Sequence, residues 1–428
     1  MIQILRYGEM ANSAVFSREL QNGGLEEKVA EIIAKVRAEG DSALFRYTEK
    51  LDHASLEKLE VPSSAFEEAF SELDSEFLAV LEEAAENIRS FHRQQLRGSF
   101  VLTEKPGVIL GQKLLPLARV GLYVPGGTAS YPSSVLMNAI PAKLAGVPEV
   151  IMVTPPSGGK IAPSILVAAK IAGVDRVFSI GGAQAVAALA YGTESVPKVD
   201  KIVGPGNAYV AEAKKQVFGQ VAIDMIAGPS EILVVADGKS DPRVVAADML
   251  SQAEHDKMSA AVLVTDSQEL AEKVSAELEL QIPLLPRAEI ARESIDRNGK
   301  IILAADLSLA IEIANEIAPE HLELCVDNPF EYLEQVKNAG SIFMGKNCPE
   351  ALGDYWAGPN HTLPTLGTAR FSSPLSVDDF VKRSSFTYYT AEALQAVAKK
   401  VACFAEHEGL LAHARSVLAR LDEGEADR

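Results

Sequence analysis

The residues best suited to chemistry gather in one short stretch of the chain, residues 353–364. It contains Asp354, His361 and the only tryptophan, Trp356, among glycines and prolines that interrupt helices and strands. The stretch is therefore predicted to be a loop that carries a carboxylate and an imidazole. Such a loop is more often a functional site than a connector, although a surface turn in which both side chains satisfy backbone groups is the alternative.

Further histidines and polar residues favour the functional interpretation, because five of the seven histidines follow residue 250. Gln252 and His255 are three residues apart at the end of a helical stretch and share one face of it. Glu320 and His321 are adjacent at the entrance of a predicted strand, where both can line a cavity when the backbone turns. Together with His413, these residues predict a zinc-like site with nitrogen and oxygen ligands and a histidine as proton acceptor.

Spacing alone leaves two choices open at this site. Carboxylates bind divalent cations better than amides do, so Glu254 competes with Gln252 as a ligand. The pattern also does not separate the histidines that bind metal from the one that accepts a proton.

Length and charge limit the classes of function. The chain has 428 residues, too many for one core, so two or more domains are expected. Its net charge of −19 repels phosphate backbones and anionic lipids, so we expect no binding of nucleic acid or membranes. No signal peptide or membrane span is recognisable, and three widely spaced cysteines exclude a disulfide framework, so a cytoplasmic location is expected.

Hydrophobic periodicity indicates the fold class. Residues 1–20 have no clear period and are predicted to form an N-terminal arm, which helices follow. From residue 108 short apolar strands alternate with helices, which predicts the α/β class with two Rossmann-like parallel-sheet units. The tail, with a strand at 385–390 and a long helix at 391–407, is predicted to be a small α+β appendage.

Small residues follow several predicted strands, at 125–127, 181–184 and 204–207. Loops at the carboxyl ends of parallel strands bind nucleotides and other anions, and Tyr123, Gln184 and Asn207 could supply stacking or hydrogen bonds there. The alternative is that the glycines only turn tight corners. No GxGxxG motif occurs in the sequence, so a dinucleotide site is indicated by architecture alone.

Seven motifs along the chain resemble those of the histidinol dehydrogenases. They read Gly-Leu-Tyr-Val-Pro-Gly-Gly at 121–127, Gly-Pro-Gly-Asn at 204–207, Ala-Gly-Pro-Ser-Glu at 227–231, Ser-Gln-Ala-Glu-His at 251–255, Ala-Pro-Glu-His-Leu-Glu at 318–323, Gly-Asp-Tyr with Gly-Pro-Asn-His and Leu-Pro-Thr at 353–365, and Glu-Gly-Leu-Leu-Ala-His at 408–413. They occur in the family's order, and we find no departure at a position that the family uses.

The resemblance implies a zinc-dependent, four-electron oxidation of L-histidinol to L-histidine through L-histidinaldehyde, with two NAD. It implies that His321 is the general base and that Glu320 activates water. The zinc ligands that it implies are Gln252, His255, Asp354 and His413. Substrate contacts would come from these ligands and His321, together with Ser230, His361 and Glu408, while Tyr123, Gln184 and Asn207 would lie on the NAD side.

The resemblance also implies a homodimer in which the C-terminal segment reaches the neighbour's site, so that Glu408 and His413 serve the other subunit. We accordingly expect a zinc and substrate domain at 21–122 and 231–370, an NAD-side domain at 123–230 and a dimer-exchanging segment at 371–428.

Three other functions compete with this one. A related zinc- and NAD-dependent dehydrogenase could oxidise another small alcohol to an acid, but Glu408 and His361 disfavour it. A cysteine aldehyde dehydrogenase could use Cys348 as its nucleophile, but no residue that could serve as a base lies at a characteristic spacing from it in the sequence. A structural zinc in a binding protein would call for thiolate ligands, and no cysteine falls in the ligand set.

Overall fold

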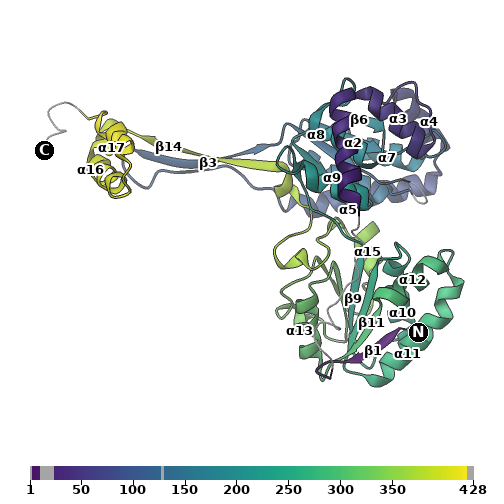
Figure 1. Ribbon diagram of the computed structural model, residues 1–428. Helices are drawn as coiled ribbons and strands as arrows, with labels where there is room; N and C mark the ends of the chain where they lie inside the picture. Colours follow the sequence, from purple (N-terminus) through teal and green to yellow (C-terminus); the bar gives the residue numbers. More distant parts are fainter. Residues whose placement is uncertain (1, 10–23, 127–129, 422–428) are drawn as a thin grey trace. The chain divides into compact units, whose positions relative to one another are not determined.

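The computed structural model describes residues 2–9, 24–126 and 130–421 of the chain. The chain forms two units: the first holds residues 1–96 and 117–380, and the second holds residues 97–116 and 381–428 (Figure 1). Residues 10–20 of the predicted arm, and Gly127 of the predicted glycine-rich turn, lie outside the described residues.

A five-stranded parallel sheet forms one half of the first unit. Its strand order is β6-β5-β4-β7-β8. The chain runs from β4 through β5 to β6 and then returns to the other side of β4, so the order reverses between β4 and β7. Ligands of open α/β sheets bind outside the carboxyl ends of the strands at such a reversal. The strands are β4 (Arg119–Tyr123), β5 (Glu149–Thr154), β6 (Arg176–Ser179), β7 (Lys201–Val203) and β8 (Ala222–Ile223).

Helices cover both faces of this sheet. Successive side chains of each strand point to opposite faces, so the apolar side chains on both faces are buried only when helices pack on each. One face packs on α4 (Ser63–Glu72), α5 (Ser75–Arg93), α6 (Pro132–Leu144) and α7 (Pro163–Ala172), and the other on α2 (Leu25–Glu39), α3 (Asp41–Asp52), α8 (Gly182–Tyr191) and α9 (Ala208–Val217). This packing differs from the predicted domain boundaries, which grouped residues 21–122 with 231–370. An amphipathic helix shows which of its faces is buried but not which sheet it covers.

A six-stranded parallel sheet forms the other half of the first unit, with the order β1-β11-β10-β9-β12-β13. Its edge strand β1 lies inside the predicted arm and pairs in parallel with β11, almost 300 residues away. The strands are β1 (Gln3–Arg6), β9 (Glu231–Ala236), β10 (Ala260–Thr265), β11 (Lys300–Leu303), β12 (His321–Cys325) and β13 (Ser341–Met344).

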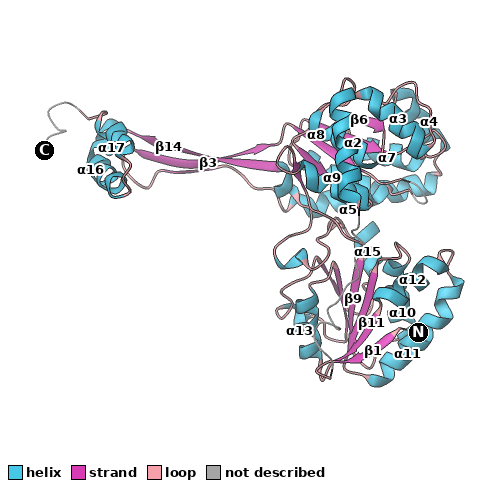
Figure 2. Ribbon diagram, viewed as in Figure 1, coloured by secondary structure: helices cyan, strands magenta, loops and turns pink. Residues whose placement is uncertain are grey.

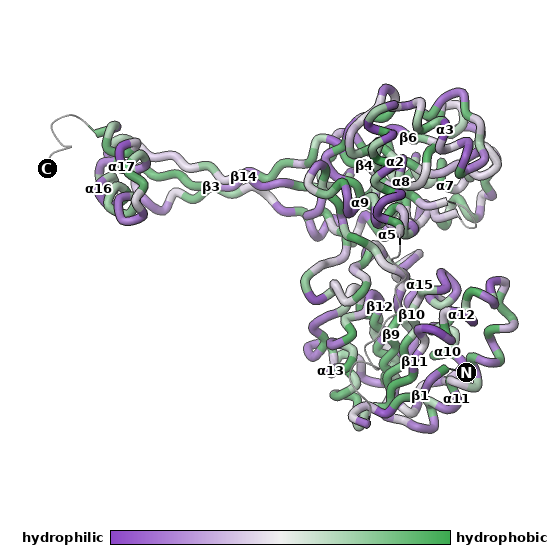
Figure 3. Tube along the Cα trace, viewed as in Figure 1, coloured by the Kyte–Doolittle hydropathy of each residue, from purple (hydrophilic) through white to green (hydrophobic). Residues whose placement is uncertain are grey.

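The central strands of this sheet are apolar on both faces, as the green tube of β9 and its neighbours shows (Figure 3). Ile232 and Val234 of β9 pack towards one set of helices, whereas Leu233 and Val235 pack towards the opposite face. The first face carries α10 (Pro242–Ala253), α11 (Gln268–Gln281) and α12 (Ala288–Asn298), and the second carries α13 (Leu307–Ile317). Two short helices, α14 (Phe330–Leu333) and α15 (Glu350–Tyr355), follow.

The second unit is a small α+β structure. Its antiparallel sheet has the order β14-β3-β2, and the long strands β3 (Val108–Pro116) and β14 (Val381–Tyr389) pair along their whole length (Figure 2). The third strand is β2 (Phe100–Leu102), and helices α16 (Ala391–His407) and α17 (Leu411–Leu418) follow β14.

The predicted α/β class, with two parallel-sheet units and a C-terminal α+β appendage, is confirmed. Within the described part of the chain, no helix is both long and apolar enough to cross a membrane.

Candidate functional site

A cavity of about 680 Å³ in the first unit brings most of the predicted site residues together. The elements around the six-stranded sheet contribute Ser230, Gln252, His255, Glu320, His321, Asp354 and His361 to its lining. The five-stranded sheet contributes Pro125 and Gly126 after β4 and residues 205–207 after β7, which flank the point where the strand order reverses.

The two sheets present opposite strand ends to this cavity. Pro125 and Asn207 follow the carboxyl ends of β4 and β7, whereas Ser230 precedes β9 and His321 begins β12. The first sheet thus lines the cavity mainly with small residues, and the second lines it mainly with polar and ionisable side chains.

His321 is held in one tautomer by the backbone. It is 3% exposed, and its Nδ1 lies 2.9 Å from the carbonyl oxygen of Glu231, which can only accept a hydrogen bond. In the neutral imidazole Nδ1 therefore carries the proton, and Nε2 is the nitrogen with a free lone pair. Nε2 lies 3.7 Å from Asp354 Oδ1, beyond hydrogen-bond distance, and has no hydrogen-bond partner among the described residues.

Three carboxyl groups surround this imidazole, of which Glu320 and Glu350 are buried and Asp354 is partly exposed. Burial raises the pKa of Glu320 to about 8, and burial together with Asp354 raises the pKa of Glu350 to about 7. Burial also acts to raise the pKa of Asp354, but the imidazoles of His321 and His361 hold it well below its ordinary value. Burial acts to lower the pKa of His321, yet these carboxylates outweigh it and raise the pKa to about 10. Asp354 is therefore the carboxylate that stays ionised beside the imidazole, whereas the raised pKa values of Glu320 and Glu350 favour their protonated forms up to about neutral pH.

The group formed by His321, Glu350 and Asp354 has the geometry of a metal centre, because one ligand atom of each lies within 4.8 Å of the others. Glu350 was not predicted from the sequence. It accepts a hydrogen bond from Ser251 at 2.8 Å and precedes Asp354 by one turn of α15. That spacing of four residues between two acids on one helix face was the signal that could have found it.

The predicted ligands Gln252 and His255 and the predicted substrate contact His361 line the same cavity. Gln252 is 1% exposed near the end of α10, and its backbone carbonyl accepts a hydrogen bond from the backbone amide of His255 at 3.1 Å. Burial lowers the pKa of both His255 and His361, which favours their neutral, metal-binding or hydrogen-bonding forms. His361 Nδ1 lies 3.1 Å from the carbonyl oxygen of Asp354. Asp354 lies in α15 and not in the loop predicted for residues 353–364, so this contact ties the loop that carries His361 to the helix.

The three residues predicted for the cofactor side are placed differently. Asn207 is exposed and lines the cavity, whereas Tyr123 and Gln184 are buried and do not line it. The hydroxyl of Tyr123 accepts the amide of Gly182 at 3.0 Å. Neither side-chain polar atom of Gln184 has a hydrogen-bond partner among the described residues, which is rare for a buried amide.

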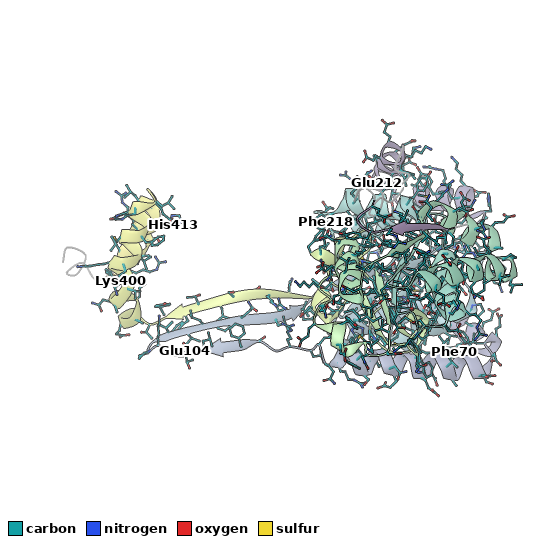
Figure 4. All side chains as sticks on the ribbon, turned by 90° about the horizontal axis from the view of Figure 1, so that it is seen from below. Phe70, Glu104, Glu212, Phe218, Lys400 and His413 are labelled. Carbon is teal, nitrogen blue, oxygen red and sulfur yellow. The ribbon has the colours of Figure 1, made fainter. Side chains whose placement is uncertain are left out.

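Glu408 and His413 belong to the second unit. Glu408 is the C-cap of α16 and His413 lies on α17, where Figure 4 labels it, and both are exposed.

Comparison with known proteins identifies the family. A model of the family described as histidinol dehydrogenase matches residues 17–421. The chain is 56% identical over 419 residues to the histidinol dehydrogenase of Syntrophotalea carbinolica, covering 97% of both chains. The chain belongs to the histidinol dehydrogenase family.

Two further similarities cover nearly the full length. The histidinol dehydrogenase of Clostridium acetobutylicum is 53% identical over 98% of this chain and 99% of its own. The crystal structure of the histidinol dehydrogenase from Elizabethkingia anophelis superposes with a TM-score of 0.93 at 37% identity, covering 98% of both chains. The chain is thus an NAD-dependent oxidoreductase of histidine biosynthesis that converts histidinol to histidine, and its family uses zinc and NAD.

Proposed function

We propose that the 680 Å³ cavity is the place where L-histidinol is oxidised to L-histidine, with His321 as the general base. The observation that carries this proposal is the Nδ1 hydrogen bond of His321 to the Glu231 carbonyl, which leaves Nε2 free beside Asp354. A buried imidazole in this tautomer is suited to accept the proton of a substrate hydroxyl.

The residues around His321 fit a zinc ion by their chemistry. We propose that Gln252, His255 and Asp354 hold it, with the partner subunit's His413 as the fourth ligand, and that Glu350 orients Asp354. The ion would orient the substrate and polarise its oxygen when bound. A cation at Asp354 would also offset the carboxylate charges that raise the pKa of His321, so that the imidazole could act as a base near neutral pH.

Oxidation of a primary alcohol to a carboxylic acid removes two hydrides, and each bound NAD accepts one. His321 takes the hydroxyl proton in the first oxidation, which yields L-histidinaldehyde. Glu320 takes a proton from water as the water adds to the aldehyde carbonyl carbon, while His321 returns its proton to the carbonyl oxygen, which gives the gem-diol. His321, a free base again, then accepts a hydroxyl proton of the gem-diol in the second oxidation. The amide of Glu231 donates to Glu320 Oε2 at 2.8 Å, so one carboxylate oxygen stays available for water.

Substrate selection would come from the remaining residues. We propose that Ser230 and His361 contact L-histidinol and that the partner subunit's Glu408 pairs with its ammonium group. The homodimer, with its second unit exchanged between subunits, belongs to the same proposal.

We assign the five-stranded sheet to NAD and the six-stranded sheet to zinc and substrate. Asn207 lines the cavity, whereas Tyr123 and Gln184 are buried and would support the NAD side of this sheet without lining the cavity. A cytoplasmic location is proposed as well, since Cys325, Cys348 and Cys403 are all free thiols.

The deciding experiment measures NADH formed per L-histidinol consumed at saturating NAD, with and without a chelator. Two NADH per histidinol, lost on chelation and restored by zinc, is the expected result. One NADH would mean that the aldehyde escapes and that Glu320 lacks the proposed role. Turnover of other small alcohols with no NADH from L-histidinol would favour a related zinc- and NAD-dependent dehydrogenase instead.

A further inference from the structure

Two buried side chains of opposite charge meet behind the loop that follows β7. Lys214 lies in the last turn of α9, and Asp224 directly follows β8. They form an ion pair with side chains that are only 2% and 1% exposed. Removing two charges from water is unfavourable, and well-packed apolar residues would serve stability equally well. The pair therefore calls for an explanation other than stability.

Both charged groups bind the backbone of Gly204. Lys214 Nζ donates to the carbonyl oxygen of Gly204 at 3.0 Å, and the amide of Gly204 donates to Asp224 Oδ2 at 2.7 Å. Because β7 ends at Val203, the ion pair supplies the hydrogen bonds that a continuing strand would have made. Apolar side chains could not do this.

The loop at 204–207 is also tied at its other end and along its side. Asn207 Oδ1 accepts the amides of Tyr209 and Val210 at 3.1 and 3.2 Å and so caps α9. A Cβ atom at Gly204 would overlap the carbonyl oxygen of Tyr123, so the loop backbone lies directly against the end of β4. Residues 205–207 between these anchors line the cavity.

Asp224 fixes a second segment of the cavity wall. The amide of Met225 donates to Asp224 Oδ1 at 2.6 Å, and residues 226–230, which end at Ser230, line the cavity. One carboxylate thus anchors both the loop that carries Asn207 and the connection to the six-stranded sheet.

We infer that Lys214 and Asp224 are positioning residues that hold the 204–207 loop and the 225–230 segment in the arrangement that binds NAD. This inference rests on the proposed assignment of NAD to the cavity wall that includes Asn207. Neither residue touches the reacting atoms, so their loss should weaken NAD binding more than it slows the chemistry.

The test compares two double variants of the zinc-loaded enzyme. Lys214→Met/Asp224→Asn removes both charges together, which avoids leaving one unpaired in the interior. The matched control is Lys201→Met/Asp379→Asn at the other end of β7, where Lys201 Nζ likewise donates to a carbonyl and a carboxylate of Asp379, at 3.0 and 2.8 Å. KM for NAD, kcat and Tm are measured for each.

The expected result is a KM for NAD raised about tenfold with kcat lowered less than about threefold in the first variant, and both constants within about twofold of wild type in the control. Hydrogen exchange should rise in peptides that cover 203–210 and 224–231 in the first variant only. An unchanged KM for NAD, or equal KM changes in the two variants, would overturn the inference.

The test also includes a single variant, in case the double variant does not fold, and a separate count of NADH for the wild type. If the double variant does not fold, Asp224→Asn alone is measured in the same way, because its side chain retains an oxygen for the Gly204 amide. An unchanged KM for NAD in that variant would again contradict the inference. The wild-type count of two NADH per L-histidinol is taken separately. A wild-type count other than two NADH would contradict the proposed function. An unchanged KM for NAD in the variant, with two NADH per L-histidinol in the wild type, would contradict only the role of Lys214 and Asp224.

Discussion

At the scale of single residues, the proposed role of His321 as general base depends on which of its nitrogens is free. The Glu231 carbonyl holds the proton on Nδ1, and the buried surroundings keep water from competing for Nε2. We expect His321→Asn to lower kcat by about 10²–10⁴-fold, the range of a lost general base, in a steady-state NADH assay. Asn can still donate to the backbone carbonyl, so the fold should persist.

A second buried histidine provides the control for this substitution. His92 on α5 is fully buried, and its Nδ1 lies 2.8 Å from Gln95 Oε1, away from the cavity lining. His92→Asn should lower Tm and leave kcat within about threefold. Equal losses of kcat in the two variants would show that the effect of His321→Asn is structural.

A different residue predicts a pH dependence of stability. Burial raises the pKa of Asp52, at the end of α3, to about 6 from its ordinary 3.8, and Oδ2 has no hydrogen-bond partner among the described residues. Because protonation favours the folded state, the stability linked to protonated Asp52 is present below about pH 4 and lost as the pH rises through about 6.

Asp52→Asn, which mimics the protonated acid, should therefore raise the free energy of unfolding at pH 7.5 by about 1–2 kcal/mol, a value discounted for partial solvent screening. At pH 4 the gain should nearly vanish. Urea titrations at both pH values measure it, with Glu49→Gln on the exposed side of the same helix as control. A gain of the same size at pH 4 would contradict the assigned cause.

Sequence patterns predicted residues that line the cavity, but they did not predict the residues that support them. Ser230, His255, Glu320 and His321 all line the cavity, because rare residue types in distinctive motifs mark them. Glu350 was missed because Asp354 was predicted to lie in a loop, and the four-residue spacing places two acids on one face only in a helix such as α15. The burial of Gln184 was missed too, because exposure depends on packing between distant segments.

At the scale of elements, Asn207 has two tasks that substitution can separate. Its Oδ1 caps α9, while its Nδ2 is the group that we propose for NAD. Asn207→Asp keeps the cap and loses the amide donor, so it should raise KM for NAD with little change in stability. Asn207→Ala should raise KM and also lower the free energy of unfolding by about 1 kcal/mol, the usual value of a lost cap.

Both variants are measured by NADH kinetics and by urea unfolding. Asp306, the N-cap of α13, accepts the amide of Leu309 at 2.8 Å and offers a matched cap control as Asp306→Ala. That variant should lose similar stability with an unchanged KM. If Asn207→Asp left KM unchanged, the amide would have no part in NAD binding.

Elements with local signals were predicted well, and elements defined by distant pairing were not. The strands β9 and β10 consist of continuous apolar runs, which are the local pattern that predicts buried parallel strands from residue 108 onwards. In contrast, β1 carries no clear period and becomes a strand only by pairing with β11. The full length of β14 likewise depends on its antiparallel pairing with β3, which no local pattern records.

At the scale of the whole molecule, the metal and the fold should be separable. The hydrophobic clusters of the first unit close around its two sheets without the cavity residues. Removal of zinc by a chelator should therefore abolish NADH formation and leave the far-UV circular dichroism spectrum unchanged, with activity restored by added zinc. Unfolding on chelation would instead indicate a structural metal.

The second unit has too little core of its own to explain its apolar surface. Its helices bury only Ala402, Ala405 and Ala414 in their common cluster, whereas Phe404 and Leu411 are 69% and 57% exposed. Apolar surface of this kind marks an interaction site, in agreement with the proposed exchange between two subunits.

The proposed exchange predicts that two inactive variants restore one another. His321→Asn and His413→Asn dimers, each inactive, are mixed under mild denaturant and returned to buffer so that subunits exchange. If the partner subunit's His413 completes each site, a mixed dimer has one site with both residues intact, and about a quarter of wild-type activity should return. His321→Asn mixed with Glu320→Gln should recover nothing, because both changes affect the same side of the site. Mixed dimers that form but stay inactive would place His413 in the site of its own chain.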